Sequence, residues 1–390
     1  MSRSSSVIIL GLLVVHTQPV FAGTDAGPAG KSPAATSSSE VKESSAFDDL
    51  WSLATLYKND ANPILQEFKL RGRYQGQYHW LDSGQGDADG WENRRSRCGF
   101  DAKLFRKRIE IRLDAQSNDG FDPLYDRLVD AYLKWKPADA FSLTLGRQKP
   151  QIGYYDWLQS TNNQPTFERS QIFGQLRVDR ATGAVAEGKV DRFTWQAGIY
   201  ANDVDREFGS LDGGVSFSAG IGYDFKELLG LEKADWRFDW LHSDIETGDT
   251  VLNRYENILS STVWLKDGRW SLVGEAFLAT GEAPDVFGFF IQPAYDLVAK
   301  KLQAVARYSF STGDGPDSVN LQRRYESEAP ALTGGGRGET YQAAYLGLQY
   351  FIHGDKLKLL AGAEYGHLDG GGNGGDFDGF TFLTGVRFSF

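Results

Sequence analysis

Apolar and polar residues alternate along Phe68–Leu81 with a period of two. Such a period places the two sets on opposite faces of one long strand. One face carries Leu70, Tyr74 and Trp80 together with glycines, and the other begins with Lys69. A strand of a soluble sandwich would carry more Val and Ile on its apolar face. Glycine and aromatic residues opposite arginine instead favour a strand with lipid on one side and water on the other.

The same alternation continues to the end of the chain and predicts sixteen strands. They are Phe68–Leu81, Arg95–Phe105, Arg108–Gln116, Leu128–Lys136, Ala140–Lys149, Phe173–Glu187, Phe193–Ala201, Val215–Phe225, Ala234–Leu241, Tyr255–Leu265, Arg269–Ala279, Phe287–Tyr295, Lys301–Thr312, Thr340–Ile352, Lys356–Tyr365 and Gly379–Phe390. The segment Phe173–Glu187 alternates least clearly. The pattern predicts an all-β fold, a transmembrane antiparallel β-barrel spanning residues 66–390.

The connections between these segments alternate between short and long. Short ones such as Lys266–Gly268 and His353–Asp355 fit periplasmic turns, and long ones such as Asp82–Arg94 and Pro150–Ile172 fit external loops. This alternation holds for a count of sixteen strands. A propeller or a β-helix would show a fixed repeat, which the sequence lacks.

The residues before the barrel divide into three predicted segments. Residues 1–22 have the features of a secretory signal peptide, with Arg3, the apolar core Val7–Val15 and a small residue, Ala22, at the cleavage site. Residues 23–45 are rich in Ala, Ser, Gly and Pro, which predicts a disordered linker. Residues 46–65 predict a short helix, which either packs on the barrel, caps its mouth or contacts a partner.

The C-terminal segment points to the bacterial outer membrane. Phe390 ends the chain after apolar residues at alternate positions, a pattern that resembles the assembly signal of outer-membrane barrels. We therefore predict the outer membrane of a Gram-negative-type bacterium, contact with its lipid, and recognition of Phe390 by the barrel-assembly machinery. Cys98 is the single cysteine, so no internal disulfide forms, and its position predicts a small apolar side chain on the lipid face.

Basic residues concentrate at the lumen positions of the first three predicted strands. They are Lys69, Arg71, Arg73, Arg95, Arg97, Lys103, Arg108 and Arg112, against the acidic Asp101, Glu110 and Asp114. Two interpretations are open at this point. Ladders of arginine and lysine select anions, and arginine binds phosphate through paired hydrogen bonds. Alternatively, the arginines pair with the three acids and only fill the wall, as in a general diffusion porin.

The predicted third external loop carries the candidates for a constriction. Arg169 is a candidate for the narrowest point if the loop folds inward, and Lys149 is the lysine nearest to the loop. In the alternative interpretation, Glu168 and Arg169 fix the loop to the wall through a salt bridge. The net charge of −11 does not decide between these, because many of the acids lie in predicted loops.

Several short motifs resemble one family of bacterial porins, the phosphate-selective porin O and P group. They are Arg94-Arg95-Ser96-Arg97, Leu128-Val129-Asp130-Ala131-Tyr132, Leu145-Gly146-Arg147-Gln148-Lys149-Pro150, Phe167-Glu168-Arg169-Ser170, Arg180-Ala181-Thr182-Gly183-Ala184 and Ala306-Arg307-Tyr308-Ser309. The resemblance extends from about Glu67 to the end of the chain. It implies a homotrimeric, sixteen-stranded porin that binds phosphate or other small anions through an arginine ladder and a lysine-containing constriction. The arginine-rich strands match, but a lysine cluster does not.

The sequence therefore predicts a water-filled channel for small anions, with a general porin as the alternative. Two other classes are a barrel enzyme and a structural or adhesive barrel with a plugged lumen. The adjacent His242-Ser243 is the strongest feature for an enzyme, but adjacency alone does not form a catalytic triad. The spacing of Cys and His fits no metal site, and no nucleotide or nucleic-acid motif occurs. We predict no cofactor and no enzymatic activity.

Overall fold

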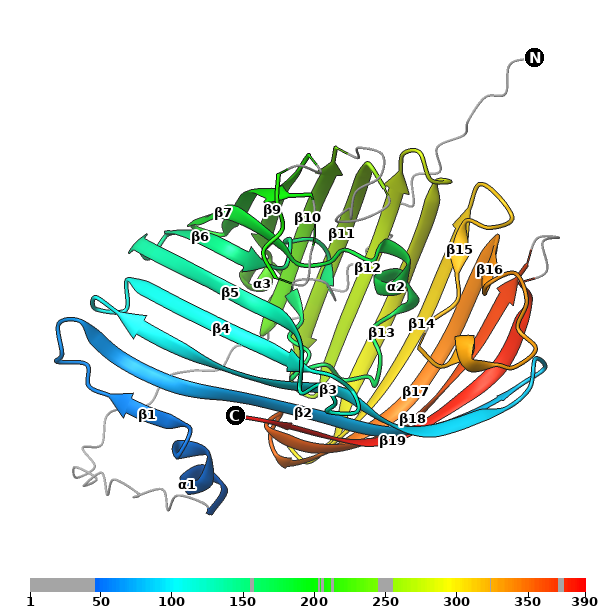
Figure 1. Cartoon of the computed structure of the whole chain (residues 1–390), viewed down its shortest axis with the longest axis horizontal. Coiled ribbons are helices and arrows are strands. Elements are labelled where there is room, and N and C mark those ends of the chain that lie inside the picture. The colour runs from blue at the N-terminus through cyan, green and yellow to red at the C-terminus, as the bar shows by residue number, and fades with distance from the viewer. Residues whose placement is uncertain are drawn as a thin grey trace, which may run out of the picture. The chain divides into compact units, whose positions relative to one another are not determined.

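In the computed structural model, long antiparallel strands pair in chain order and close into a ring (Figure 1). The structure describes residues 46–154, 158–202, 204, 207–211, 214–244, 255–322, 324–370 and 375–390. The predicted signal peptide and linker lie outside these residues. Within the described residues, no helix has the length and apolar character needed to cross a membrane.

Sixteen strands form the closed wall. They are β2 (Leu65–Ser83), β3 (Ala88–Leu104), β4 (Ile109–Ser117), β5 (Tyr125–Ala138), β6 (Phe141–Gln148), β7 (Ala181–Val190), β8 (Phe193–Ala201), β9 (Val215–Asp224), β10 (Lys233–Ser243), β11 (Asn257–Asp267), β12 (Trp270–Thr280), β13 (Val286–Val298), β14 (Leu302–Gly313), β17 (Thr340–His353), β18 (Leu357–Asp369) and β19 (Phe377–Ser389). The predicted number of strands and the antiparallel barrel are confirmed.

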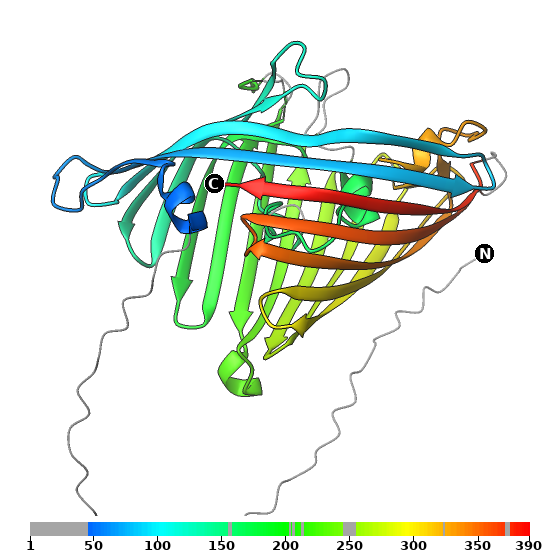
Figure 2. The same cartoon turned by 90° about the horizontal axis from the view of Figure 1, so that it is seen from below.

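The ring closes where the last strand pairs with the first. Phe388 of β19 lies opposite Tyr74 of β2, and Figure 2 shows these strands side by side. Closure leaves no open edge, so the backbone groups of the wall are paired even inside a bilayer. The predicted two faces are present, because Leu70 and Trp80 are exposed on the outside while Gln77 is buried inside.

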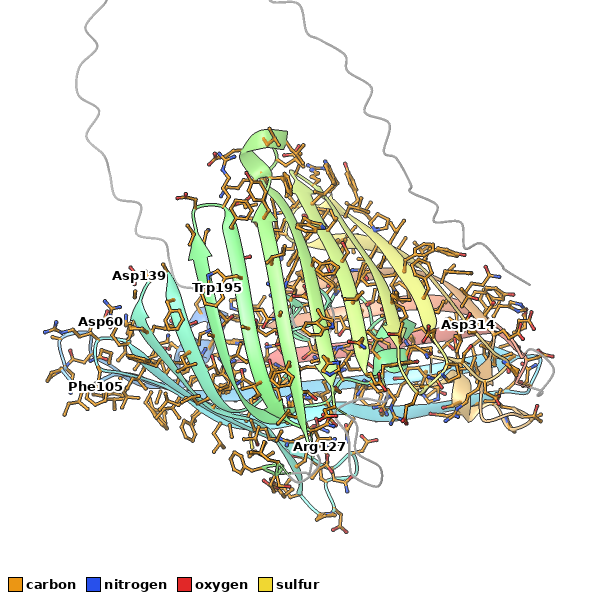
Figure 3. The ribbon with its side chains drawn as sticks, turned by 90° about the horizontal axis from the view of Figure 1, so that it is seen from above. Asp60, Phe105, Arg127, Asp139, Trp195 and Asp314 are labelled. Atoms are coloured by element: carbon orange, nitrogen blue, oxygen red, sulfur yellow. The ribbon has the colours of Figure 1, made fainter. Side chains whose placement is uncertain are left out.

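The first external connection is shorter than predicted. The interpretation of Asp82–Arg94 as a long loop was wrong, because β2 and β3 remain paired up to Leu81 and Ala88. Acidic residues and glycines obscured the alternation there. The opposite ends of the strands are visible in Figure 3, where Asp139 lies at one end of β5 and Arg127 near the other.

The sixth predicted strand is partly wrong. The helix α2 (Gln171–Leu176) overlaps the first residues of the segment predicted as Phe173–Glu187, and the strand β7 starts only at Ala181. Ile172 and Leu176 are one helical turn apart and are both buried. The alternation was weak because this part of the chain packs as a helix.

Two external connections fold into the barrel. The third loop (residues 149–180) contains α2, and the seventh loop (residues 314–339) contains the short pair β15 (Val319–Asn320) and β16 (Arg337–Gly338) and the 3-10 helix η2 (Glu326–Glu328). Helix α2 contacts β13, β14 and β15. Tyr154, Leu176 and Val319 form one buried apolar cluster with Phe277 and Phe290 of the wall. The open space therefore lies beside the other strands of the barrel.

The N-terminal segment packs on the wall. Helix α1 (Ala46–Ser52) places Trp51 against Phe388, with ring centroids 5.4 Å apart, and its Nε1 donates a hydrogen bond to the carbonyl of Ser389 at 2.6 Å. Strand β1 (Thr55–Lys58) then pairs with the first residues of β2. This segment covers the seam at which the barrel closes. A helix therefore forms in the predicted region 46–65, followed by a strand.

Candidate functional site

Two arginines face each other across the first two strands of the wall. Arg73 of β2 and Arg97 of β3 are direct partners in the antiparallel register. Both line a cavity of about 270 Å³ inside the barrel, named here the middle cavity. Directly opposed side chains of one charge destabilise a sheet. Such a pair is unusual unless something negative compensates for it.

Some of the predicted basic residues are paired with acids. Nη1 of Arg71 is 2.9 Å from Asp101, and Nε of Arg112 is 2.7 Å from the other oxygen of the same carboxylate. Arg71 also lies 3.8 Å from Asp114. Lys103 pairs with Glu67 at 2.7 Å. For these residues the wall-filling interpretation matches the contacts.

Arg73 and Arg97 have different surroundings. Arg73 donates a hydrogen bond to the hydroxyl of Thr161, and Arg97 donates one at 3.1 Å to the amide oxygen of Gln116. These partners are neutral. The nearby Asp130 is held by another arginine, Arg180, at 2.9 Å. The positive charge of the opposed pair is therefore not cancelled by a carboxylate hydrogen-bonded to either member among the described contacts.

The other basic residues predicted to line the lumen lie in different parts of the barrel. Arg95 is buried and donates to Gln75 at 2.8 Å on the lumen face. Lys69 lines a smaller cavity of about 220 Å³ beside the C-terminus. Arg108 is exposed in the turn between β3 and β4, where it donates to the carbonyl of Pro137 at 2.6 Å. Arg108 thus lies at the periplasmic rim, outside the strand in which it was predicted.

The third loop is fixed to the wall by Glu168, but through a partner that the sequence did not suggest. Arg94 donates two hydrogen bonds to the two oxygens of Glu168, at 2.7 and 2.9 Å. Burial raises and the facing Arg94 guanidinium lowers the pKa of Glu168, and the net result is a pKa well below the usual range. The carboxylate is therefore ionised and occupied. Arg169, the other residue of that prediction, lies over the ring of Phe173.

Three cavities follow one another through the barrel. An outer cavity of about 420 Å³ and the middle cavity share four lining residues, Arg97, Lys149, Arg169 and Arg180. The middle cavity and a periplasmic cavity of about 830 Å³ share Lys134, Gln151 and Glu187. We name this series the candidate pathway, and the four residues shared by its first two cavities the constriction group.

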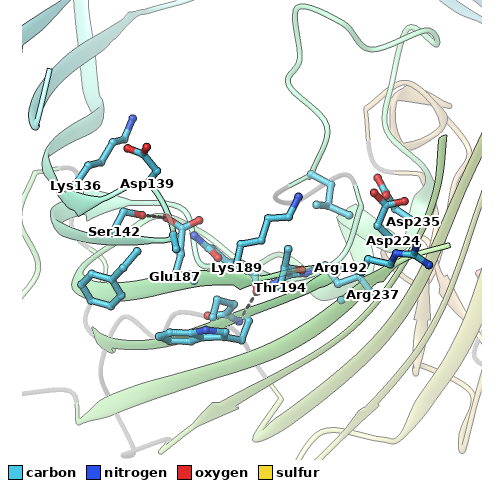
Figure 4. Close-up of a pocket in the computed structure, with 18 of the residues that line it drawn as sticks. Lys136, Asp139, Ser142, Glu187, Lys189, Arg192, Thr194, Asp224, Asp235 and Arg237 are labelled. Atoms are coloured by element: carbon cyan, nitrogen blue, oxygen red, sulfur yellow. Dashed lines mark hydrogen bonds between the residues drawn. The ribbon is translucent and has the colours of Figure 1, made fainter. Parts of the chain in front are cut away.

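Basic side chains dominate the candidate pathway. Among the described residues that line the outer cavity, ten are Arg or Lys and two, Glu168 and Asp179, are acidic. The middle cavity has eight basic residues and two acids, Asp130 and Glu187. The periplasmic cavity is more mixed, and Figure 4 shows Lys189 there together with Glu187 and Asp235. Arginine and lysine therefore outnumber the acidic residues among the described residues that line the outer and middle cavities.

The strongest sequence feature for an enzyme does not form a catalytic pair. His242 and Ser243 are adjacent in β10 and therefore point to opposite faces of the wall. His242 Nδ1 lies 3.1 Å from Asn257, and the buried Ser243 accepts a hydrogen bond from Ser216 at 2.9 Å. Within the described residues, no group of three or more His, Cys, Asp or Glu is arranged to hold a metal ion.

A closed sixteen-stranded barrel with a polar interior pathway has the architecture of an outer-membrane porin channel. The chain resembles one family of these proteins, since the family model described as "Phosphate-selective porin O and P" matches residues 68–221. This confirms the resemblance seen in the sequence and the outer-membrane location. The matched residues include the opposed arginine pair and the constriction group. No curated protein matches the sequence of the chain.

Solved porin structures share the fold at low sequence identity. The OmpF porin of Salmonella typhi in complex with daunomycin has a TM-score of 0.60 at 13% identity, with 86% of this chain and 100% of that chain covered. An anion-selective porin from Comamonas acidovorans has a TM-score of 0.58 at 10% identity, with 83% of this chain and 99% of that chain covered. OprB of Pseudomonas putida has a TM-score of 0.56 at 14% identity, with 83% of this chain and 94% of that chain covered. At these identities the likeness shows the fold alone.

Proposed function

We propose that this porin conducts small anions, with phosphate as the solute class that its arginines fit best. The observation that carries the proposal is the opposed pair of Arg73 and Arg97, whose described hydrogen-bond partners are neutral. An anion between two guanidinium groups relieves their repulsion and accepts several charge-assisted hydrogen bonds. Tetrahedral phosphate offers more acceptor positions to such a pair than chloride does.

The surroundings of the pair favour this function over general diffusion. Acidic side chains opposite a basic wall would offset its charge, and the channel would then favour neither sign strongly. Here the loop side of the middle cavity presents Gln159, Ser160 and Thr161. The carboxylate of Glu168 is occupied by Arg94. The potential along the candidate pathway is therefore positive, which concentrates anions.

Planar-bilayer recording tests the proposal. The purified protein is expected to form channels whose reversal potential in a salt gradient shows a preference for anions. Phosphate added to chloride is expected to reduce the chloride current, because it occupies the arginine pair. A preference for cations, or a chloride current unchanged by phosphate, contradicts the proposal while the porin class stands.

The assembly of the protein belongs to the same proposal. We infer a homotrimer in the outer membrane, delivered after removal of residues 1–22 and inserted through recognition of Phe390 by the barrel-assembly machinery. In the folded barrel, the backbone N–H of Phe390 donates to the carbonyl of Gly72 at 3.0 Å and extends the pairing along the seam. Chemical cross-linking in intact membranes measures the oligomer, and N-terminal sequencing of the mature protein locates the cleavage site.

A further inference from the structure

The ring of Phe173 lies beneath two cations of the constriction group. Nζ of Lys149 is 4.3 Å from the ring centroid, and Cζ of Arg169 is 3.9 Å from it. The quadrupole of an aromatic ring attracts a cation placed over its face within about 6 Å. One uncharged side chain thus contacts two like charges where the outer and middle cavities meet.

The helix α2 presents this ring to the pathway. Ile172 and Leu176 bury one side of the helix in the apolar cluster of the loops and the wall. The amide of Gln175 donates to the carbonyl of Ser318 in the seventh loop at 2.8 Å and so fixes the same side. Phe173 is only partly buried and lines the outer cavity. The other side of α2 is therefore fixed by packing and hydrogen bonding, and this holds Phe173 at the cavity.

We propose that Phe173 is a positioning residue for anion selectivity. Its ring holds Lys149 and Arg169 together at the constriction without neutralising either charge. This inference rests on the proposed anion channel. A carboxylate at the same place would also hold the two cations, but it would cancel part of the positive potential that draws anions in. The ring has a quadrupole but no net charge, so it attracts the two cations without reducing the positive potential.

Removing the ring without changing any charge tests the proposal. In Phe173→Leu, the phosphate concentration that halves the chloride current is expected to rise by about two- to five-fold, the range given by cation–π contacts at accessible sites. The reversal potential in a salt gradient is expected to move toward zero. Phe173→Tyr retains the ring and is expected to behave as the unchanged protein. The heat-modifiable shift of the folded barrel on gels shows that each variant is assembled.

A double substitution separates positioning from a general structural role. In the unchanged protein, Lys149→Gln is expected to weaken the block of the chloride current by phosphate. In the Phe173→Leu variant the same substitution is expected to weaken the block less, because Lys149 is no longer held in position there. The proposal is overturned if Phe173→Leu and Phe173→Tyr weaken the phosphate block equally. It is also overturned if the effects of Phe173→Leu and Lys149→Gln on the phosphate block are fully additive. An unchanged block in Phe173→Leu, in a channel that still prefers anions, also overturns it and leaves the proposed function intact. A parent channel without anion preference overturns the proposed function itself.

Discussion

Arg73 and Arg97 are direct cross-strand partners on the lumen face of β2 and β3. Two like charges placed opposite each other cost a sheet stability, in the range of about 0.2–1 kcal/mol for such pairs. The described contacts of this pair, Thr161 and Gln116, supply no negative charge. The proposed anion would relieve this repulsion by accepting hydrogen bonds from both guanidinium groups.

Replacing one member of the pair is therefore expected to change transport and stability in opposite directions. In Arg97→Gln the phosphate concentration that halves the chloride current rises by about ten-fold or more, as expected when a charge-assisted hydrogen bond of about 1.5–3 kcal/mol is lost. The temperature at which the folded band disappears on gels is unchanged or slightly higher, because the repulsion is gone.

Arg108→Gln is the matched control for this experiment. Arg108 was predicted to lie on the same basic wall, but it is exposed in a turn at the periplasmic cavity, does not line the middle cavity, and donates hydrogen bonds to backbone carbonyls. Its substitution is expected to leave the phosphate block as it is in the parent protein. Equal effects of the two substitutions would mean that the total charge, and not the opposed pair, determines selectivity.

The contact between Glu168 and Arg94 predicts a pH-dependent attachment of the third loop. The pKa of Glu168 is lowered in the folded protein, so its contribution to stability is fully present above the usual glutamate pKa of about 4.3 and is lost as pH falls toward the folded value. Glu168→Gln is expected to lower the free energy of unfolding by about 1–3 kcal/mol at neutral pH, because the partly buried Arg94 loses the carboxylate to which it donates two hydrogen bonds. Proteolysis of the loop in detergent, followed from pH 7 to pH 3, measures the effect.

The comparison across pH provides the control. The parent protein is expected to become more susceptible to proteolysis as pH falls below about 4, whereas Glu168→Gln is expected to be susceptible throughout and to change less. If both proteins respond to acid in the same way, another acidic group controls the loop.

The sequence allowed the wall to be predicted well because each strand has one face in lipid. Alternation places Leu70 and Trp80 outside and Arg71 and Arg73 inside without further information. Alternation fails at Arg94, because the register of β2 and β3 shifts between Gln75 and Gly76 and inserts one extra residue. This bulge turns Arg94 toward the lumen together with Arg95. A period of two has no means of showing such a shift.

The interior of the barrel was less accessible to prediction. Arg180 belongs to the constriction group, but it lies at the end of the third loop, where alternation is weak. The proposed role of Phe173 depends on the packing of the helix α2 within the lumen. Both follow from contacts between segments far apart in the chain, such as Gln322 of the seventh loop donating to the carbonyl of Arg169 at 2.7 Å. Local patterns do not contain this information.

Trp51 is expected to stabilise the seam of the barrel from outside the ring of strands. Its ring packs on Phe388 and its Nε1 donates to the carbonyl of Ser389. Trp51→Ala is expected to cost about 3–5 kcal/mol, the range for removing a large buried aromatic side chain. Trp51→Phe retains most of the packing and is expected to cost only about 0.5–1.5 kcal/mol for the lost hydrogen bond. Thermal loss of the folded gel band measures both, and Leu53→Ala, at an exposed position, serves as the control.

The last residue of the chain requires a glycine on the first strand of the barrel. A Cβ added at Gly72 would lie 2.2 Å from the ring of Phe390, which packs directly over that backbone. Gly72→Ala therefore forces the terminal ring out of its place and is expected to cost about 1–3 kcal/mol, as overpacking does elsewhere. The same substitution at Gly274 of β12 meets its nearest atom, a backbone oxygen, at 3.7 Å and is expected to be neutral. Comparing the temperatures at which the two variants lose the folded gel band tests the contact. Equal stability would mean that the contact between Phe390 and Gly72 adds nothing to the stability of the closed barrel.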